Sequence, residues 1–288
     1  MMTVQQALER GIALLTEARQ DSARLDAQVL LGHVLGVERT RLYAYPETGI
    51  TPKEERQFFA LIERRGRGEP VAYLVGHQEF YGLDFLVDRR VLIPRPETEL
   101  LVETALNVCR ERLDAGQTPV VADIGTGSGA IAITLAVEEP RLPYLYATDI
   151  SMDALEVADL NCRRHHVEQR VRLLHGDLLT PLPEPVDVFT ANLPYVGTNE
   201  MGILEADVRD YEPHLALFSG DEGLDALRRL FLQAQHSRVV SEGAVFLLEI
   251  GYRQREALNE MVHEMWPQAD VMFKKDYAGW DRLLQVRV

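Results

Sequence analysis

The sequence predicts an α/β protein with a mostly parallel sheet, an antiparallel hairpin at one sheet edge and a small N-terminal helical bundle. Three observations lead to this prediction. Apolar residues recur at helical spacing over roughly the first 72 residues. From Pro119 onward short apolar runs alternate with helical patterns, and the last two such runs have no helix between them. Near-continuous apolar strands are typical of a parallel sheet that helices cover on both faces.

The composition is that of a folded globular protein. The chain has 288 residues, 46% of them hydrophobic, which suffices for one large domain and a smaller partner. No run approaches the roughly 18 apolar residues that cross a membrane, and the N-terminal segment lacks the features of a signal peptide. Cys109 and Cys162 lie in helical patterns away from any CxxC or His pair, so we expect reduced thiols and no metal site. These features predict a cytoplasmic protein without membrane attachment.

The formal net charge is −15, which disfavours direct binding to duplex nucleic acid, because such proteins need cations to replace the phosphate counterions. The best candidate for a local basic patch is ERRGRGEP, residues 63–70. We interpret this run as a solvated linker.

Residues 1–75 are predicted to form a helical domain. Apolar spacing favours one helix over DAQVLLGHVLG, and another begins with Thr51 as its N-cap and Pro52 at its first position. The composition then changes, since EFYGLDFLVD is rich in aromatic and β-branched residues around Gly82. This pattern favours a short hairpin, and we predict a β-hairpin linker over residues 76–95.

Residues 96–288 are predicted to form the larger domain, in which Pro96 starts the first helix with Glu97 and Glu99 in its first turn. Strands are predicted at VVADIG, YLYATD, VRLLHGD, VDVFTAN and AVFLLEIG, and helices at AIAITLAVEE, MDALEVADLNCRRH, EGLDALRRLFLQAQH and QREALNEMVHEM. The final strands, DVMFKK and DRLLQVRV, are separated only by DYAGW and should pair antiparallel at one edge.

The first motif that carries chemistry is a glycine loop, in which Gly125, Gly127 and Gly129 lie between a strand and a helix. Glycines there let the backbone approach a ligand closely. The spacing is GxGxG, not the GxGxxG of a dinucleotide site, and the loop lacks the lysine of a P-loop. A tight strand-to-helix turn without a ligand is the alternative interpretation.

Two acidic residues end the next two strands. Asp149 follows the last glycine by about 20 residues, where a carboxylate can bind both hydroxyls of a ribose, although it could instead cap a helix. Asp177 could accept from the exocyclic amine of an adenine, with Leu178 covering the ring, or could cap a turn. Three loops therefore converge on one crevice. They fit an adenosine with a non-phosphate substituent, so S-adenosylmethionine fits better than NAD or ATP.

The fourth loop is NLPY, residues 192–195. The order GxGxG, DIS, GD and N-x-P-Y resembles class I methyltransferases that methylate amines, whose usual motif is N/D-P-P-Y/F. The resemblance implies that the Asn192 side-chain oxygen and the Leu193 carbonyl accept the two hydrogens of a planar NH2, while Tyr195 stacks on it. Leu193 departs from the usual proline, but every residue has a carbonyl and Pro194 still favours an extended Leu193. We expect the geometry to survive with some loss of rigidity.

Long stretches of the chain resemble the release-factor glutamine methyltransferases, the PrmC/HemK family. The resemblance lies in DAQVLLGHVLG, in GEPVAYLVGHQEFYGLDFLVDRRVLIPRPETELLVE, in LLEIG and in KDYAGWDRLLQVRV. It covers essentially the whole chain, and IPRPETE is its most specific element. It implies an N-terminal domain that recognises release factors, a hairpin linker and a Rossmann-like, seven-stranded class I S-adenosyl-L-methionine-dependent methyltransferase domain.

The family implies methylation of the N5 amide of the glutamine in the Gly-Gly-Gln motif of class I peptide-chain release factors. We expect a monomer that does not bind nucleic acid directly. Two alternatives stay open. A nucleic-acid adenine-N6 methyltransferase would share NLPY, but predicts a basic face and a target-recognition insert, and neither is visible in the sequence. A module that binds cofactor and protein without catalysis would be consistent with the Leu193 departure.

The resemblance also assigns roles to individual residues. The methionine part and ribose of the cofactor contact a loop made of Gly125, Thr126, Gly127, Ser128 and Gly129. Asp149 holds the ribose, while Asp177 and Leu178 lie at the adenine. Asn192 contacts cofactor and target amide, and forms the catalytic clamp with Leu193, Pro194 and Tyr195. Arg95, Glu97 and Thr98 are expected to border the crevice.

Overall fold

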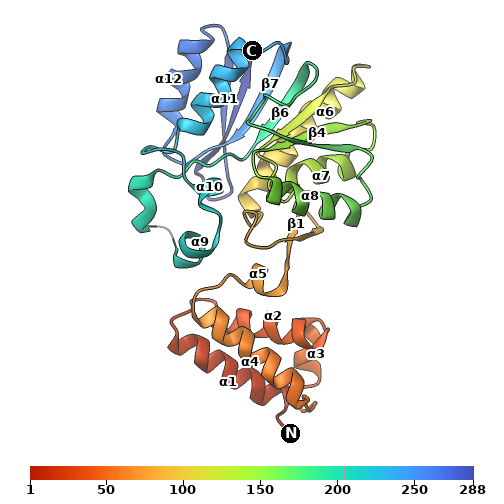
Figure 1. Cartoon of the computed structure of the whole chain (residues 1–288), viewed down its shortest axis with the longest axis vertical. Helices are drawn as coiled ribbons and strands as arrows, with labels where there is room; N and C mark the ends of the chain where they lie inside the picture. Colours follow the sequence, from red (N-terminus) through yellow and green to blue (C-terminus); the bar gives the residue numbers. More distant parts are fainter. Residues whose placement is uncertain (204) are drawn as a thin grey trace. The chain divides into compact units, whose positions relative to one another are not determined.

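A computed structural model of the chain describes residues 1–203 and 205–288. These residues divide into two compact units. Unit 1 consists of Met1–His77 together with Glu205–Tyr211, and unit 2 consists of the other described residues. Figure 1 shows the helices of unit 1 and the central sheet of unit 2.

Unit 1 is the small helical bundle that the sequence predicts. Its apolar core contains Leu15, Leu30, Leu31 and Phe58, all fully buried. Thr51 caps its helix as predicted, because the Thr51 side chain accepts from the Glu54 N–H while the Glu54 carboxylate accepts from the Thr51 N–H. The helices are α1 (Val4–Glu17), α2 (Ala23–Leu35), α3 (Arg39–Ala44), α4 (Pro52–Gly66), α5 (Val71–Val75) and α9 (Ala206–Tyr211).

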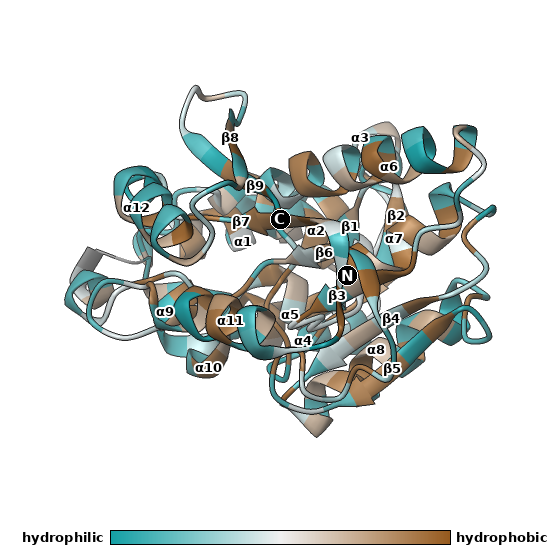
Figure 2. Cartoon of the chain, turned by 90° about the horizontal axis from the view of Figure 1, so that it is seen from above, coloured by the Kyte–Doolittle hydropathy of each residue, from teal (hydrophilic) through white to brown (hydrophobic). Residues whose placement is uncertain are grey.

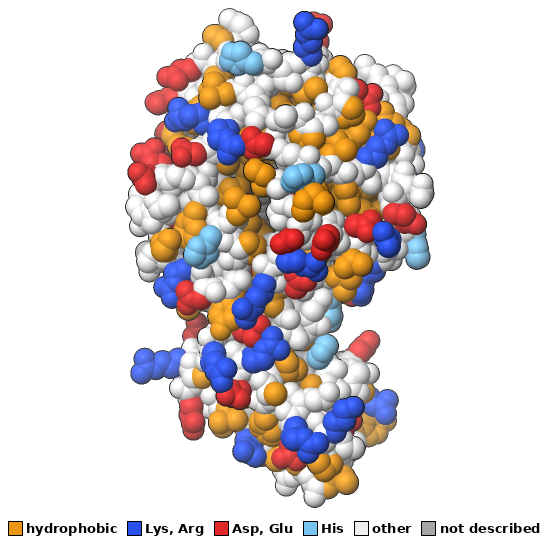
Figure 3. Space-filling model, viewed as in Figure 1, with side chains coloured by type: hydrophobic (Ala, Val, Ile, Leu, Met, Phe, Trp, Pro, Cys, Tyr) orange, Lys and Arg blue, Asp and Glu red, His pale blue; other side chains and the backbone are white. Residues whose placement is uncertain are grey.

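The interpretation of ERRGRGEP as a linker is wrong, because its first four residues form the last turn of α4. Arg64 donates two hydrogen bonds of 2.7 Å to the Glu69 carboxylate, and buried Arg65 donates one of 2.7 Å to Asp26. Figure 3 shows Lys and Arg side chains on the visible face of unit 1. Within this run the cations are matched by carboxylates, so the run supplies little free positive charge.

Helix α9 joins unit 1 from a distant part of the sequence. Asp207 lies 3.5 Å from the Arg65 guanidinium, and the Tyr211 hydroxyl donates to the Arg67 carbonyl at 3.1 Å. Sequence reasoning did not anticipate this, because the helical pattern of the N-terminal part ends long before residue 205.

A two-stranded hairpin precedes the main sheet, formed by β1 (His77–Phe80) and β2 (Leu83–Leu86). Its turn contains Gly82 at φ +73°, a left-handed conformation that glycine adopts without steric cost. The 3₁₀ turn η1 (Pro96–Thr98) follows and leads into α6 (Glu99–Asp114). The helix start predicted at Pro96 is therefore a 3₁₀ turn, and the α-helix begins three residues later.

The main sheet has seven strands in the order β5-β4-β3-β6-β7-β9-β8. The first five in this order are parallel, and β9 pairs antiparallel with both β7 and β8, which confirms the predicted edge pair. Ile124 lies beside Thr148 and Ala191, so β3, β4 and β6 end side by side. The strands are β3 (Val121–Ile124), β4 (Leu145–Asp149), β5 (Val171–His175), β6 (Val186–Ala191), β7 (Val240–Glu249), β8 (Asp270–Lys275) and β9 (Asp281–Arg287).

Helices cover both faces of this sheet, as predicted. One apolar core joins the sheet to α6, α7 (Ala130–Glu138) and α8 (Met152–Arg164), and a second joins it to α11 (Asp225–His236) and α12 (Arg255–Met265). Helices α11 and α12 each contain hydrophilic and hydrophobic residues, as expected of helices that bury one face (Figure 2). Two short elements, η2 (Thr198–Ile203) and α10 (His214–Leu217), follow β6.

Asn161, a buried residue of α8, links the hairpin to the glycine loop. Its Oδ1 accepts from the Leu86 N–H at 2.7 Å, and its Nδ2 donates to the Leu86 carbonyl at 3.0 Å and the Ser128 carbonyl at 2.9 Å. Truncation of the Asn161 side chain would leave the N–H and carbonyl of Leu86 and the carbonyl of Ser128 without this hydrogen-bond partner.

We expect Asn161→Ala to lower the free energy of unfolding by about 2–4 kcal/mol, because each lost bond to a buried partner costs on the order of 1 kcal/mol or more. Asn107→Ala is the matched control, since Asn107 is an exposed asparagine within α6. Urea denaturation of the two variants and the wild type measures the difference. Equal midpoints for both variants would contradict the assigned role.

Candidate active site

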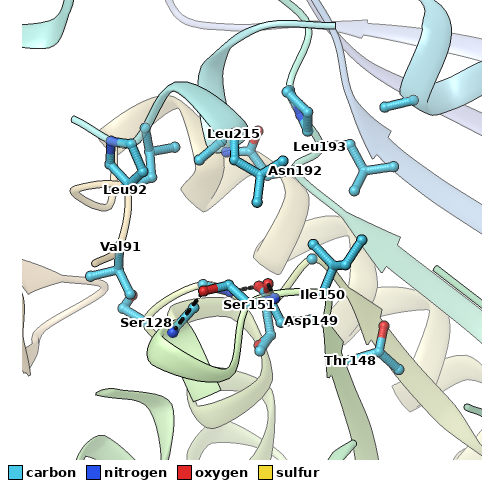
Figure 4. A pocket seen from close by; sticks show the side chains of 18 of the residues that line it. Val91, Leu92, Ser128, Thr148, Asp149, Ile150, Ser151, Asn192, Leu193 and Leu215 are labelled. Carbon is cyan, nitrogen blue, oxygen red and sulfur yellow. Dashed lines mark hydrogen bonds between the residues drawn. The ribbon is translucent and has the colours of Figure 1, made fainter. Parts of the chain in front are cut away.

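A pocket opens in unit 2 where β3, β4, β5 and β6 end. Figure 3 shows hydrophobic side chains gathered along a hollow on the visible face of unit 2. Figure 4 shows Asn192 and Leu193 on one side of the pocket, and Ser128, Asp149 and Ser151 on the opposite side. Of the residues singled out from the sequence, the lining includes Thr98, Gly125, Thr126, Gly127, Ser128, Asp149, Asp177, Leu178, Asn192, Leu193 and Pro194. Gly129, Tyr195, Arg95 and Glu97 are not among the described lining residues.

The glycine loop bends through left-handed backbone at Gly125, Gly127 and Gly129, whose φ angles are +73°, +56° and +83°. Only glycine adopts such angles without strain. A Cβ atom at Gly125 would lie 2.8 Å from Leu193 Cδ2, whereas one at Gly127 would meet open space. Gly125 therefore leaves room for the Leu193 side chain of the neighbouring loop, whereas Gly127 is needed for the backbone conformation of the turn.

Asp149 ends β4 beneath this loop. Its Oδ2 accepts from the Gly127 N–H and its Oδ1 from the Ser151 N–H, both at 2.9 Å. Ser151, not Asp149, caps α8 by accepting from the Ala154 N–H. Burial raises the pKa of Asp149, and the backbone N–H bonds oppose this rise. Each carboxylate oxygen can accept more than one hydrogen bond, so Asp149 could also accept from two ligand hydroxyls.

Asp177 and Leu178 form the next wall of the pocket. The Asp177 carboxylate is bound by Arg229 Nη2 at 2.5 Å and by Gln233 Nε2 at 2.9 Å, both from α11. Leu178 has a φ of +50°, which is rare for a residue with a side chain, and its carbonyl accepts from Thr148 Oγ1 at 3.1 Å. These contacts fix the loop after β5, and the contribution of Arg229 was not foreseen from the sequence.

Asn192 directly follows β6. Its Nδ2 donates to Thr98 Oγ1 at 3.1 Å, and Thr98 Oγ1 donates to Glu249 Oε2 at 2.6 Å. Glu249 ends β7 and is buried, which raises the pKa of its carboxyl. Sequence reasoning missed Glu249, although an acidic residue that ends the apolar run AVFLLE is an unusual feature and could have signalled it.

Tyr195 is held from two sides. Its hydroxyl donates to Glu249 Oε1 at 3.2 Å, and burial raises the pKa of this phenol. Gln254 Nε2 donates to the Tyr195 carbonyl at 3.0 Å and to the carbonyls of Glu222 and Gly223, each at 3.2 Å. The backbone that leaves the pocket is thus fixed by side chains from the end of β7 and the start of α12.

Leu193, which stands where related motifs have proline, is buried and belongs to the core under α11 and α12. Its side chain lies against Gly125 of the glycine loop. The departure therefore places an apolar contact between the two loops of the pocket.

Arg95 pairs with Glu212, whose carboxylate also accepts from the Ile93 N–H at 3.1 Å. Glu212 is buried, so this pair anchors the segment that precedes η1. The arrangement supports the pocket wall around Pro94 and Thr98.

Asp123 lies fully buried in β3. Its oxygens accept from Thr126 Oγ1 at 2.6 Å and from Thr190 Oγ1 at 2.9 Å. Burial raises the pKa of Asp123 to about 6, while the two hydroxyl bonds oppose the rise. The folded protein therefore binds this proton more tightly than the unfolded chain does. The contribution of Asp123 to stability falls as the pH rises from about 4, its unfolded pKa, to about 6.

We expect the wild type to gain about 1 kcal/mol of stability from Asp123 between pH 8 and pH 5, and Asp123→Asn to lose this gain. Urea denaturation of both proteins at pH 8 and pH 5 gives the change in the free energy of unfolding between the two pH values. The difference between the two changes is the contribution of Asp123. Asp153→Asn, which changes an exposed carboxylate of α8, is the control. An identical pH dependence in Asp123→Asn and the wild type would show that the carboxyl is not held as described.

The two cysteines, Cys109 and Cys162, are free and buried, and burial raises the pKa of each thiol to about 12. Across residues 1–203 and 205–288, no three His, Cys, Asp or Glu side chains are grouped so that they could hold a metal ion. In the same residues, no helix is both long and apolar enough to span a membrane.

The fold and pocket define a class of protein. A seven-stranded sheet with one antiparallel edge strand pair, a glycine loop after β3 and an acidic residue after β4 form a class I methyltransferase domain. Residues 98–212 match the family model "Methyltransferase small domain", and residues 6–76 match "PrmC N-terminal domain". A methyltransferase from Pyrococcus furiosus shares the fold, with 20% identity, 78% of this chain and 96% of that chain covered, and a TM-score of 0.51. The hMettl16 catalytic domain also shares it, with 14% identity, coverage of 79% and 81%, and a TM-score of 0.56.

The chain belongs to the release factor glutamine methyltransferase family. It is 43% identical to the release factor glutamine methyltransferase of Moorella thermoacetica, over 98% of this chain and 97% of the relative. It is 41% identical to that of Koribacter versatilis, over 98% of each chain. The family resemblance predicted from IPRPETE and NLPY is confirmed, and the protein is a methyltransferase.

Proposed function

We propose that this protein methylates the N5 amide of the glutamine in the Gly-Gly-Gln motif of class I peptide-chain release factors. The observation that carries the proposal is that Asn192, Leu193 and Pro194 line the same pocket as the glycine loop, with Ser128 of that loop on the side opposite Asn192 (Figure 4). Relatives that match over nearly the whole of this chain and of their own length are named release factor glutamine methyltransferase, which supports this substrate class.

S-adenosyl-L-methionine is the proposed cofactor, and when bound it supplies an electrophilic methyl carbon on a cationic sulfur. The residues present fit it. Asp149 keeps acceptor capacity beside Gly127 for the two ribose hydroxyls, and Thr126 and Ser128 complete the loop around the methionine part. Asp177 and Leu178 are assigned to the adenine, and Asn192, which lines the same pocket, to both the cofactor and the target amide.

The chemistry of the protein residues follows from the poor reactivity of an amide nitrogen, whose lone pair is delocalised. Asn192 Oδ1 and the Leu193 carbonyl would accept hydrogen bonds from its two N–H groups and aim the lone pair at the methyl carbon. Such positioning can contribute several kcal/mol without a strong base. Pro194 keeps Leu193 extended, and Tyr195 completes the clamp with its hydroxyl fixed on Glu249.

The domain roles are part of the proposal. Residues 1–75 would recognise the release factor, and residues 96–288 would bind the cofactor and catalyse methyl transfer. Residues 76–95 would connect these two domains. The match of residues 6–76 to a PrmC N-terminal domain supports the first assignment. We place the reaction in the cytoplasm, as the unpaired thiols of Cys109 and Cys162 suggest. We propose that the protein acts as a monomer.

Tritiated S-adenosylmethionine tests the substrate class. We expect label on an intact class I release factor and none on duplex DNA, because the chain carries a net charge of −15. Equilibrium binding of the cofactor serves as the control for an active preparation. Label on adenine in DNA, with none on the release factor, would replace this proposal by an adenine-N6 methyltransferase.

A further inference from the structure

A chain of hydrogen bonds runs from Asn192 in the pocket wall through Thr98 to the buried carboxylate of Glu249. Thr98 Oγ1 lies between Asn192 Nδ2, at 3.1 Å, and Glu249 Oε2, at 2.6 Å. The three residues come from η1, the end of β6 and the end of β7, and all belong to unit 2. Thr98 is 4% exposed and Glu249 2%, so water has little access to replace a lost partner.

The chain has a direction that follows from its end at Glu249. Thr98 Oγ1 donates to Glu249 Oε2 at 2.6 Å, so the one proton of the Thr98 hydroxyl points to Glu249. The Thr98 oxygen can then only accept from its other neighbour. Of the two ends of the Asn192 amide, only the NH2 group can donate to it. The reverse orientation would set Asn192 Oδ1 against the Thr98 oxygen with no proton between them, at the cost of a buried unsatisfied pair.

The second oxygen of Glu249 is also occupied. The Tyr195 hydroxyl donates to Oε1 at 3.2 Å, and the positive charge of Arg282 acts on the same carboxylate. Burial raises the pKa of Glu249, and the hydrogen bonds from Thr98 and Tyr195 and the charge of Arg282 oppose this rise. The same carboxylate thus anchors both ends of the NLPY segment, through Thr98 at Asn192 and directly at Tyr195.

We propose that Thr98 and Glu249 are positioning residues that fix the orientation of the Asn192 amide, so that Oδ1 is the atom presented to the substrate. This inference rests on the proposed function, in which Oδ1 accepts a hydrogen bond from an N–H of the target amide. If the side-chain amide of Asn192 were rotated by half a turn, its NH2 group would face the NH2 group of the target amide. The target N–H would then have no side-chain oxygen to donate to. This role accounts for a threonine at position 98 of IPRPETE, which its position at the start of a helix does not explain.

Kinetics of three variants test the proposal. Thr98→Val keeps the shape but removes the hydroxyl, and we expect kcat to fall about 100-fold, the loss typical of a misplaced catalytic group. The KM for S-adenosylmethionine should change little. Thr98→Ser should restore most of the rate. Thr104→Val, at another buried threonine of the adjoining helix α6, is the matched control. A Thr98→Val enzyme with wild-type kcat, or a Thr98→Ser enzyme as slow as Thr98→Val, would overturn the proposal.

A measurement without substrate separates this inference from the proposed function. In protein labelled with ¹⁵N-asparagine, the side-chain NH2 signals of Asn192 are assigned by their loss in Asn192→Ala. We expect one of its protons to exchange slowly in the wild type and in Thr98→Ser, and rapidly in Thr98→Val. Should Thr98→Val fail to fold, Thr98→Ala takes its place in both experiments. Rapid exchange in the wild type would overturn the inference, even if methyl transfer occurs. A wild type that methylates nothing but shows the protected proton would overturn only the function.

Discussion

Replacing Asn192 by alanine is expected to lower the rate of methyl transfer by about 10³-fold while the protein stays folded. The substitution removes the side-chain acceptor aimed at the reacting nitrogen, and loss of one preorganised hydrogen-bonding group in an active site costs about 10²–10³ in kcat. The fold should survive, because Thr98 keeps its bond to Glu249 and Asn192 itself is only partly buried.

The control for this prediction is Asn199→Ala, which removes an exposed asparagine seven residues further along the chain. Single-turnover kinetics with saturating cofactor and release factor measure the chemical step. A rate in Asn192→Ala equal to that of Asn199→Ala would remove Asn192 from the mechanism.

Replacing Asp149 by alanine should weaken cofactor binding about 100-fold or more. A hydrogen bond to a charged acceptor contributes about 1.5–3 kcal/mol, and Asp149 is assigned two of them to the ribose. The variant also loses the bonds that Asp149 accepts from the N–H groups of Gly127 and Ser151. Isothermal titration with S-adenosylhomocysteine measures the dissociation constant, and Asp153→Ala is the control on the neighbouring helix turn.

An analogue of the ligand without ribose hydroxyls divides these two contributions. If Asp149 binds the ribose, this analogue should bind the wild type and Asp149→Ala with similar affinity. If Asp149→Ala instead weakens binding of the analogue as much as it weakens binding of the natural ligand, the effect belongs to the glycine loop alone.

Elements and their order could be predicted from the sequence where local pattern decides them. The five parallel strands are apolar runs that end in loops, and DVMFKK and DRLLQVRV had to pair antiparallel because DYAGW is too short for a crossover. Thr51 and Pro52 mark a helix start that the structure confirms. The interpretation of ERRGRGEP as a solvated linker was wrong, because sequence pattern alone does not show that Arg64 and Arg65 bond to the carboxylates of Glu69 and Asp26.

Contacts between distant residues could not be predicted in this way. Thr98 and Glu249 are 151 positions apart in sequence, and apolar periodicity reports that a position is buried but not which side chain meets it. The same holds for the bond of Arg229 to Asp177, and for helix α9, which packs in unit 1 although it follows NLPY. The sequence therefore identifies the residues that face the pocket better than those that hold them there.

The location of the transferred methyl group tests the central claim most directly. An intact release factor is incubated with this protein and S-adenosylmethionine, and the peptide that contains Gly-Gly-Gln is then fragmented in a mass spectrometer. We expect one added methyl on the side chain of that glutamine, and none when Asn192→Ala replaces the wild type. An unmodified glutamine, from a preparation that binds the cofactor, would contradict the proposed function.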